Sequence, residues 1–367
     1  MFATTITEIS ARVEKIDPVE YGRSRNFLNG AVTRLSPYIS RGVISPKYVL
    51  DAVRKKGYQP YQLEKFVQEL AWREYFQNVW QSKGNQIDDD LKQAQTAVAN
   101  RQMPTALINA ETGIEAVDDA VNQLYETGYI HNHLRMYLAS VACNTAQSHW
   151  RVPAKWLYFH LLDADWASNG LSWQWTAGAF SSKKYWVNQE NINKYSGTNQ
   201  RGTFLDADYA DLPDLPIPEV LRATELPVLK TALPLKVPLE IDNALPTLIY
   251  NFYNLDPFWQ ADIEANRVLL FEPTHFQKYP VSEKAINFAL KLAENIGGIK
   301  IYTGEFNDLA REYDLREIHY KEHPTAAHYR GIETARDWMF PEIKGYFPGF
   351  FGYWKKCQRL MKTKNRG

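Results

Sequence analysis

Apolar residues recur with the 3.6-residue period of an α-helix in the first half of the chain. In one such stretch apolar residues recur at Phe66, Leu70 and Phe76 or Val79, and runs of β-branched residues are few. The same pattern covers residues 63–80, 114–124, 130–142 and 154–162. Glycines precede two of these stretches and Pro153 precedes a third, as is typical of helix boundaries. We therefore predict a mainly α-helical domain over residues 1–206.

The segment that follows is rich in proline. Seven of the 19 prolines lie there, namely Pro213, Pro216, Pro218, Pro227, Pro234, Pro238 and Pro246. Proline at this spacing prevents a regular helix, because it lacks a backbone N–H and has a fixed φ. We predict an extended linker or a belt laid across the helical domain over residues 207–246. The length favours a belt, since structureless connectors of more than about 15 residues are uncommon in compact proteins.

The last third of the chain alternates between two patterns. Short apolar runs typical of buried strands occupy residues 248–252, 267–272, 299–303 and 317–321. Helical patterns lie between and after them, at residues 283–296, 306–313 and 327–339. This alternation predicts a small, Rossmann-like α/β domain with a parallel sheet over residues 247–367. Within it we expect residues 346–354 to form an aromatic loop and residues 355–366 to form a basic tail.

Charge and cysteine content limit the classes of function. The 367 residues include 42 Lys and Arg against 42 Asp and Glu, which excludes a nucleic-acid binder that works by bulk positive charge but not a local basic face. The two cysteines, Cys143 and Cys357, allow one disulfide at most. Residues 1–18 contain acidic residues and no apolar run, and no stretch approaches the roughly 20 apolar residues of a membrane span. We expect a cytoplasmic protein without a membrane segment.

Aromatic residues are unevenly distributed. Six of the 11 tryptophans fall in one short stretch, as Trp150, Trp156, Trp166, Trp173, Trp175 and Trp186. One interpretation is a helical core that uses large residues. The other is a pocket for a flat ligand, because aromatic rings stack well on planar groups.

Common catalytic and metal motifs are missing from the sequence. No two glycines are separated by a single residue, so there is no G-x-G-x-x-G motif, and neither the Walker phosphate loop nor G-x-S-x-G occurs. His131 and His133 are two positions apart on a predicted helix and therefore point in different directions. No cysteine pair has zinc spacing. We therefore expect no bound metal ion. The missing motifs also argue against a hydrolase, a kinase or an NAD-dependent dehydrogenase.

Three segments gather polar and aromatic groups on single helix faces. They are residues 69–76, 129–136 and 163–175. In the first, an acid, an indole and a guanidinium share one side, although a surface ion pair beside a buried tryptophan would also explain that segment alone. In the third, Asp165 and Asn169 are one helical turn apart. Asp163 could pair with Arg135 across helices, and such a pair would orient both groups.

These segments, in this order, resemble the FAD-binding helical domain of the photolyase and cryptochrome family. The resemblance runs from Tyr21 to about residue 206. It rests on Tyr21 with Arg25-Asn26, Arg34-Leu-Ser-Pro-Tyr38, Glu69-Leu-Ala-Trp72-Arg73-Glu74, His131-Asn-His-Leu-Arg135-Met136, Asp163-Ala-Asp165 and Trp173-Gln-Trp175. Each motif is weak singly, whereas the set in this order and spacing is specific.

The resemblance implies that the chain binds FAD. Tyr21 and the segment from Thr33 to Ser36 would hold the phosphates, and Val32 stands where the family usually has a phosphate-binding Thr. The Arg135–Asp163 pair would flank the isoalloxazine ring, Asp165 would bond its polar edge and Asn169 would face N5. The implied cofactor-binding residues are Tyr21, Thr33, Arg34, Leu35, Ser36, Arg73, Arg135, Asp163, Asp165 and Asn169. A second, antenna chromophore is left open.

The resemblance also implies contacts with damaged DNA. The residue types with which cyclobutane-dimer photolyases contact the lesion are all matched here, by Glu69, Trp72, Asn132, Met136 and Trp175. Indoles would stack on a flipped-out pyrimidine pair, and the carboxylate would bond its polar edge. Arg25, Lys183 and Lys184 would contact phosphates, although a solvated loop is the simpler explanation of the two lysines.

Two departures from the family stand out. Photolyases pass electrons to the flavin along three tryptophans; Trp173 and Trp150 match the proximal and middle ones, but the distal position falls at Ala97. Either the relay ends early, or a tyrosine, Trp80 or Trp156 substitutes. Family members also begin with an α/β antenna domain, whereas the α/β pattern comes last in this chain. It is either a rearranged form of that domain, which residues 268–304 faintly resemble, or an unrelated module.

The leading functional hypothesis is FAD-dependent, light-driven DNA repair. Reduced flavin would donate an electron to a cyclobutane pyrimidine dimer, which is the lyase reaction of a deoxyribodipyrimidine photolyase. The alternative is a cryptochrome-like blue-light photoreceptor that signals to a protein partner. A third interpretation is a flavoprotein that serves only as a structural or binding module. We expect a monomer with UV-damaged DNA as its partner.

Overall fold

A computed structural model of the chain describes residues 2–364. Contacts within the chain divide it into two compact units. Unit 1 consists of Met1–Val19, Thr33–Gly84 and Lys230–Gly367, and unit 2 consists of Glu20–Val32 and Asn85–Leu229. Unit 1 therefore combines the first helices of the chain with its last third, and the boundaries at residues 206 and 246 remain a prediction.

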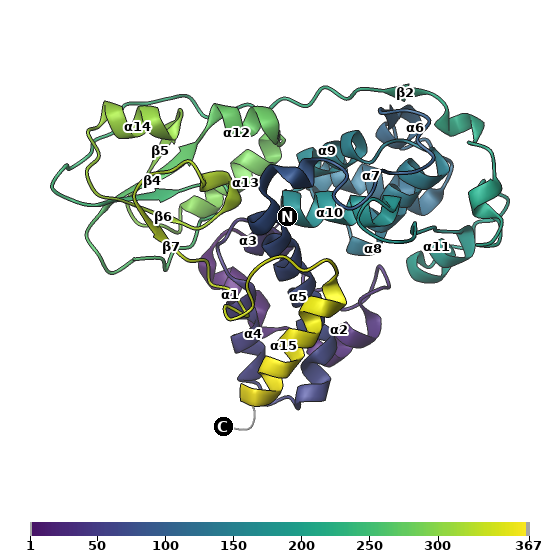
Figure 1. Ribbon diagram of the computed structural model, residues 1–367, viewed down its shortest axis with the longest axis horizontal. Helices are drawn as coiled ribbons and strands as arrows, with labels where there is room; N and C mark the ends of the chain where they lie inside the picture. The colour runs from purple at the N-terminus through teal and green to yellow at the C-terminus, as the bar shows by residue number, and fades with distance from the viewer. Residues whose placement is uncertain (1, 365–367) are drawn as a thin grey trace. The chain divides into compact units, whose positions relative to one another are not determined.

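Unit 2 is built mainly from helices (Figure 1). Its helices are α6 (Thr105–Ile108), α7 (Glu115–Thr127), α8 (Asn132–Ser140), α9 (Arg151–His160), α10 (Trp166–Ala177) and α11 (Gln189–Ser196), with a π-helix at Val141–Thr145. Helix α10 packs against α8 and α9. The side chain of Asp165 caps α10 by accepting a hydrogen bond from the Ser168 backbone, and Gly178 ends the helix with a φ of 82°. The helices predicted at residues 114–124, 130–142 and 154–162 are confirmed.

The helical part of unit 1 is formed by the N-terminal region. Its helices are α1 (Ile6–Glu14), α3 (Ser36–Ser40), α4 (Pro46–Arg54) and α5 (Pro60–Lys83), while α2 (Pro18–Ser24) lies where the chain passes from one unit to the other. Pro60 starts α5, where its missing N–H costs little, and Gln59 and Gln62 form a capping box. The helix predicted at residues 63–80 is confirmed as part of α5.

The rest of unit 1 contains a five-stranded parallel sheet (Figure 1). Its strands are β3 (Thr247–Tyr250), β4 (Asn266–Phe271), β5 (Ile299–Thr303), β6 (Ile318–Lys321) and β7 (Ile332–Thr334), in the order β5-β4-β3-β6-β7. The connecting helices are α12 (Pro273–Lys278), α13 (Glu283–Ala293) and α14 (Phe306–Glu312). Strand β3 is buried throughout, and Ile249 pairs with Val268 on one side and Tyr320 on the other. The predicted fold class, helical with a small parallel α/β part, is confirmed.

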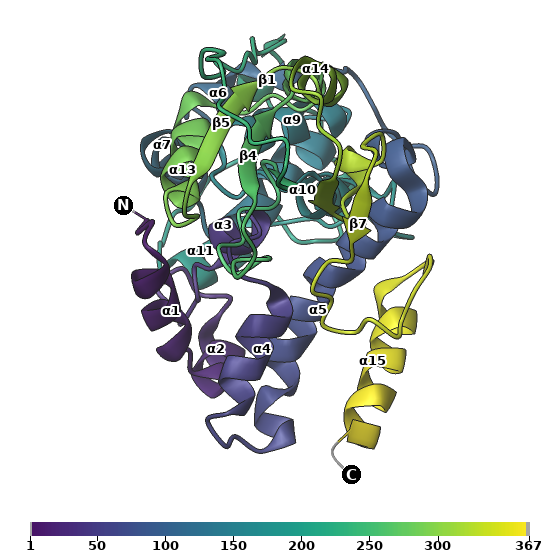
Figure 2. The same ribbon diagram turned by 90° about the vertical axis from the view of Figure 1, so that its left-hand side faces the viewer.

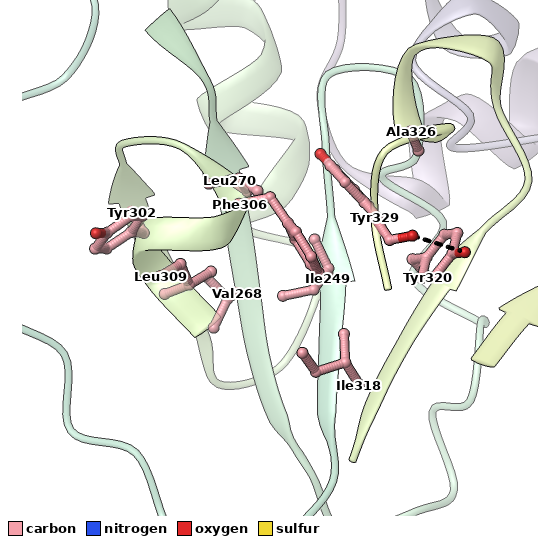
Figure 3. Packing of buried hydrophobic residues seen from close by; sticks show 10 residues of the cluster. All are labelled: Ile249, Val268, Leu270, Tyr302, Phe306, Leu309, Ile318, Tyr320, Ala326 and Tyr329. Carbon is pink, nitrogen blue, oxygen red and sulfur yellow. Dashed lines mark hydrogen bonds between the residues drawn. The ribbon is translucent and has the colours of Figure 1, made fainter. Parts of the chain in front are cut away.

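One face of the sheet carries a cluster of buried apolar residues (Figure 3). The cluster consists of Ile249, Val268, Leu270, Tyr302, Phe306, Leu309, Ile318, Tyr320, Ala326 and Tyr329. The Phe306 and Tyr329 rings stack with centroids 4.4 Å apart, so α14 is held against the segment that follows β6. Leu239 and Ile241 from the Pro-rich segment pack against this cluster. The end of that segment is thus part of the core of the α/β region.

The helix predicted over residues 327–339 is wrong. A 3₁₀ turn at Pro324–Ala326 leads instead into β7, in which Ile332 pairs with His319 of β6. Gly331, with a φ of 142°, lies so close to β6 that a Cβ would be 2.3 Å from the Ile318 carbonyl oxygen. Pairing with the edge of the sheet therefore outweighs the local helical pattern.

The predicted loop at residues 346–354 is also partly wrong. Helix α15 begins at Phe350 and continues to Lys364, so most of the predicted basic tail is helical, and residues 365 and 366 of that tail lie outside the described residues. Glycines at 345, 349 and 352 lower the local helix propensity. Burial offsets this cost, because α15 packs beside α5 (Figure 2). The side chains of Tyr353, Trp354 and Cys357 are buried.

The Pro-rich segment forms a strand pairing and side-chain hydrogen bonds with other parts of the chain. Strand β2 (Thr224–Glu225) pairs antiparallel with β1 (Met103–Pro104) in unit 2. Further on, Thr231 exchanges hydrogen bonds with Val281 of unit 1, at 2.8 and 2.9 Å. Apart from 3₁₀ turns at Leu212–Asp214 and Glu219–Leu221, residues 211–246 form no helix, as the prolines predict.

Both cysteines are buried and free. Cys143 lies in the π-helix of unit 2 and Cys357 in α15 of unit 1. Burial raises the pKa of each thiol, which makes both poor nucleophiles.

Candidate functional site

The ion pair expected between Arg135 and Asp163 is present in unit 2. Arg135 Nη1 lies 2.9 Å from Asp163 Oδ2, and the two side chains are 20% and 4% exposed. The Arg135 Nε also donates to the Ile130 carbonyl, and its guanidinium lies over the Tyr129 ring. A pair this well buried fixes the orientation of both groups, because separating them would leave a desolvated charge.

Asp165 and Asn169 lie on the next segment, and both are buried. Asp165 accepts a hydrogen bond from the Ser168 hydroxyl at 2.9 Å besides capping α10. The Asn169 amide donates to the Ala154 carbonyl of α9 at 2.7 Å, which leaves its oxygen as an acceptor. The structure thus holds a guanidinium, two carboxylates and an amide in fixed orientations on α8 and at the start of α10.

The proposed relay tryptophans are buried in the same unit. Trp173 and Trp150 are 2% and 0% exposed. The Trp150 indole donates to Asp90 Oδ1 at 2.6 Å, and its ring centroid lies 6.2 Å from that of Trp166. Trp166 donates in turn to Asp88 Oδ1 at 2.7 Å. Neither aspartate was identified from the sequence, because the long separation in the chain gives no local signal.

The two tryptophans expected as substitutes at the distal relay position, Trp156 and Trp80, have different neighbours. Trp156 contacts the rings of Tyr125 and His160, and its indole donates to the Tyr125 hydroxyl at 3.1 Å. Trp80 belongs to unit 1, where its ring contacts Tyr253, Tyr279 and His323. Of Trp80, Trp156 and Trp166, it is Trp166 whose ring lies beside that of Trp150.

Three of the proposed lesion-contacting residues lie in unit 2. Asn132 is exposed at the first position of α8, and Met136 is half-buried one turn later on the same face. Trp175 is half-buried on α10, and its ring lies 5.6 Å from the Tyr185 ring. Since α10 packs against α8, these side chains come from two adjoining helices.

The residues proposed for phosphate contact differ in accessibility. Lys183 is exposed, whereas Lys184 is half-buried and donates to the Thr96 carbonyl at 2.9 Å, and burial lowers its pKa. Arg25 is half-buried and donates to the Gly22 carbonyl at 3.0 Å. Neighbouring residues, among them Arg23, Phe27 and Asn29 but not Arg25 itself, line an open hollow of about 530 Å³. Lys183 is therefore the more accessible of the two lysines.

The remaining cofactor candidates lie in unit 1, apart from Tyr21, which is half-buried on α2. Thr33, Arg34, Leu35 and Ser36 form the entry to α3, and Arg34 is exposed with a φ of 52°. Arg73 on α5 donates to the Ser40 hydroxyl of α3 at 2.6 Å. That bond ties the end of α3 to α5, and the unusual backbone at Arg34 turns the chain into the start of α3.

Glu69 and Trp72 occupy one face of α5, as expected. Glu69 pairs with Lys65 at 2.8 Å and remains partly exposed. The Trp72 indole stacks on Phe350 of α15, with ring centroids 3.7 Å apart and an angle of 11° between the planes. The aromatic run at residues 346–354 was the signal for this contact, but a loop was predicted there.

A buried carboxylate holds α15 and the preceding segment against α5. Glu74 accepts hydrogen bonds from the Met339 and Phe340 backbone N–H groups at 2.6 and 2.9 Å and from the Tyr353 hydroxyl at 2.9 Å. Burial nevertheless raises the pKa of Glu74. The aromatic cover of Trp72 is therefore fixed by several polar contacts as well as by stacking.

The carboxyl edge of the sheet, where strand order reverses at β3, is filled by side chains of unit 1. The His323 ring stacks on Tyr253, with centroids 4.3 Å apart. The Arg41 guanidinium is buried and lies 3.4 Å above the centre of the Phe252 ring. This edge is the usual ligand crevice of an open parallel sheet, and here it serves as a packed core.

The residues of unit 2 fit a flavin in their chemistry. Arg135 supplies N–H donors, Asp163 and Asp165 supply acceptors, and Asn169 can do both, which suits a planar ring whose edge alternates donors and acceptors.

Among the described residues there is no group of three or more His, Cys, Asp and Glu side chains arranged for a metal ion. No described helix combines the length and apolar character that a bilayer crossing requires.

Sequence comparisons with known proteins point in the same direction. Residues 66–230 match the model of the FAD binding domain of DNA photolyase. Over 206 residues, 53% of this chain and 42% of the relative, the sequence is 27% identical to the deoxyribodipyrimidine photo-lyase of Alkalihalophilus pseudofirmus. Over 225 residues, 56% of this chain and 45% of the relative, it is 28% identical to the cryptochrome DASH of Synechocystis sp.. A solved cryptochrome from Synechocystis sp. PCC6803 aligns with a TM-score of 0.49 at 24% identity, covering 60% of this chain and 48% of that one.

The chain spans less than half the length of these curated relatives. The match to the FAD-binding domain nevertheless covers the segment that carries Arg135, Asp163, Asp165 and Asn169, and it identifies FAD as the cofactor. The FAD-binding helical region is therefore the part of the chain that is related to photolyases and cryptochromes.

Proposed function

We propose that the protein is a light-driven photolyase that repairs cyclobutane pyrimidine dimers in DNA. The observation that carries this proposal is the buried Arg135–Asp163 pair with Asp165 and Asn169 beside it, within the segment that matches a photolyase FAD-binding domain. Reduced FAD, when bound and excited by light, supplies the electron that splits the dimer. Several relatives are named deoxyribodipyrimidine photo-lyases, which supports the same reaction.

Each of the proposed cofactor-binding residues has a defined role in this function. Arg135 and Asp163 would fix the flavin ring by charge-assisted hydrogen bonds, and Asp165 would accept from its polar edge. Asn169 would meet N5 with a neutral amide, which adds no charge to a reduced ring. Tyr21, Arg34 and Ser36 would hold the phosphates. The Arg135, Asp163, Asp165 and Asn169 side chains are oriented before the cofactor arrives, so little ordering of these four groups is needed when it binds.

The lesion would be recognised by aromatic and polar groups. Trp72 and Trp175, both half-buried, would stack on the pyrimidines, and Glu69 would bond their polar edge. Asn132 and Met136 would complete the contacts from α8. DNA phosphates would meet Arg25, Lys183 and Lys184, so binding is expected to weaken as salt is raised.

A second candidate function is a blue-light photoreceptor that lacks repair activity. Two observations favour it: Phe350 covers one face of Trp72, and Ala97 stands where the relay would have its outer tryptophan. The similarity to cryptochrome DASH sequences supports it as well. In that case Glu69 and Trp72 would be inherited features, and a protein partner would replace DNA.

A repair assay distinguishes the two functions. The purified protein with chemically reduced FAD is given an oligonucleotide with one cyclobutane thymine dimer, in blue light and in the dark. Light-dependent recovery of the two thymines is expected, and Glu69→Ala should reduce it strongly. Glu294→Ala, a change of the same kind at an exposed position of unit 1 just after α13, is the matched control. Absence of repair by a protein that binds FAD and reduces it in light would favour the photoreceptor.

A further inference from the structure

Helix α15 concentrates positive charge in a protein without net charge. The whole chain has 42 basic and 42 acidic residues. Residues 350–364, in contrast, contain Lys355, Lys356, Arg359, Lys362 and Lys364 and no acidic residue. The function proposed above uses none of these side chains, so the charge excess has no role yet.

The inner face of α15 is fully used for packing. Tyr353, Trp354 and Cys357 are buried, and Phe350 stacks on Trp72 of α5. Gln358, two turns further along α15, donates to Glu64 at 2.7 Å. Because Phe350 meets residue 72 and Gln358 meets residue 64, the two helices run antiparallel in register (Figures 1 and 2). The helix is therefore anchored along its length and presents one defined outer face.

The outer face consists of cations and one aromatic ring. Lys355, Arg359 and Lys362 are exposed at i, i+4 and i+7, which places them in one row, and the Lys356 ammonium lies beside them over the Phe347 ring. Within the described residues none of the four pairs with a carboxylate. Phe351, at the start of the row, is 72% exposed, and its ring lies 6.4 Å from that of Trp72.

We propose that this outer face of α15 is a binding surface for a single strand of DNA. Lys355, Lys356, Arg359 and Lys362 would contact successive phosphates, and Phe351 would stack on a base. From Phe351 to Lys362 the helix rises about 16 Å, at 1.5 Å per residue. A row of cations next to an exposed ring is the combination by which proteins hold single strands without sequence preference.

The packing of α15 argues against a membrane surface as its partner. An interfacial amphipathic helix inserts its apolar face into the headgroup region, but here Tyr353, Trp354 and Cys357 are buried against the protein. Only Phe351 among the large apolar side chains of α15 is strongly exposed. The surface that remains is suited to phosphates and one base.

The test uses undamaged DNA in the dark, so its outcome is independent of light, lesion and repair. A fluorescently labelled 20-nucleotide single strand is titrated with the full-length protein, and anisotropy is followed at several salt concentrations. Replacing Lys355, Lys356, Arg359 and Lys362 together by Gln should weaken binding at least tenfold. The slope of log affinity against log salt should fall by about two to three, because each lost phosphate contact on a single strand removes about 0.7.

A matched control removes the same amount of charge elsewhere in unit 1. Arg54, Lys55, Lys230 and Lys291 are likewise exposed, and replacing all four by Gln should change affinity and salt slope little. Equal effects of the two quadruple variants would show that only net charge matters and would overturn the proposal. Thermal unfolding of both variants shows whether the fold is kept.

A single substitution keeps the proposal testable if the quadruple variant unfolds. Phe351→Ala should weaken single-strand binding about fivefold, since a stacked base contributes at least about 1 kcal/mol, and should leave duplex binding unchanged. An unchanged affinity for the single strand would refute the role of the ring. Binding of α15 cations to vesicles of phosphatidylserine and phosphatidylcholine, with no effect of the substitutions on DNA, would replace the proposal by a membrane surface.

Discussion

The indole of Trp72 and the phenyl ring of Phe350 stack face to face within unit 1, with centroids 3.7 Å apart and planes 11° from parallel. Phe350 is itself parallel to Trp354 at 6.1 Å, so three rings from two helices form a continuous stack. In the proposed repair reaction, a flipped base would stack on the opposite face of Trp72, or Phe350 would have to move away. Helix α15 therefore determines which face of Trp72 is open to a flipped base.

The stack should contribute measurably to stability. Phe350→Leu keeps an apolar side chain in place but removes the ring, so we expect the free energy of unfolding to fall by about 1–2 kcal/mol. Urea denaturation measures the change. Phe351→Leu is the matched control, since that ring is 72% exposed and its loss should cost under about 0.5 kcal/mol. Similar losses in both variants would contradict the energetic importance of the Trp72–Phe350 contact.

Local sequence patterns predicted the parts of the fold that depend on local chemistry. The strand at residues 299–303 coincides with β5, and the other three predicted strands differ from the observed ones by one or two residues at an end. The ion pair between Arg135 and Asp163 was predicted from their placement on two helices and is present. In these cases the periodicity and the tertiary contacts demand the same conformation.

The failures arise where distant contacts decide the structure. Strand β7 forms because Gly331 can lie against the edge of β6, and no periodicity near residue 331 reveals that edge. Helix α15 forms despite its glycines because Tyr353 and Trp354 are buried beside α5. The hydrogen bond from Trp166 to Asp88 joins residues 78 positions apart. Sequence motifs identified the candidate residues. The residues that pack on them or hydrogen-bond to them could be identified only from the three-dimensional structure.

Stability should fall in acid partly because of His275. Burial lowers the pKa of this imidazole from its ordinary 6.5 to about 4, and its Nε2 has no hydrogen-bond partner among the described residues. A lowered pKa in the folded state means that the unfolded chain binds the proton more readily, so the contribution is present above pH 6.5 and is lost as pH falls through 4. It amounts to roughly 3 kcal/mol at 1.36 kcal/mol per pH unit.

A substitution isolates that contribution. His275→Phe keeps a ring among Tyr253, Phe276 and Tyr279 and removes the titrating group. Between pH 7 and pH 4 the variant should lose less stability than the parent protein, as measured by urea denaturation at each pH. Some acid sensitivity should remain, because burial also lowers the pKa of His323. Parallel pH profiles would show that His275 does not couple folding to protonation.

Asn169 offers a test of the proposed flavin site. Asn169→Asp would place a negative charge beside the ring and would also remove the hydrogen bond to the Ala154 carbonyl. We expect the reduced cofactor to become harder to form and maintain, because added negative charge on the ring is then repelled. Asn169→Ala removes the same hydrogen bond without adding charge and serves as the control. The proposed role of Asn169 requires that the aspartate variant lower the flavin reduction potential more than the alanine variant does.

The last prediction concerns the outer end of the electron relay. Trp150 and Trp166 are fully buried, their rings lie 6.2 Å apart, and each indole N–H donates to an aspartate, Asp90 or Asp88. A carboxylate on the indole N–H stabilises the positive charge that an oxidised tryptophan carries. We therefore expect Trp166 to act as the next tryptophan of the electron relay beyond Trp150, in place of the tryptophan that is missing at Ala97.

Flavin photoreduction, followed by absorbance in the presence of an external reductant, measures this role. Trp150→Phe should slow it most strongly, and Trp166→Phe should slow it by a smaller factor. Asp88→Asn should have an effect in the same direction as Trp166→Phe, because it removes the charge beside that indole. Trp156→Phe is the matched control, since Trp156 is equally buried but contacts Tyr125 and His160 instead. Slower photoreduction in the Trp156 variant with an unaffected Trp166 variant would assign the outer position to Trp156.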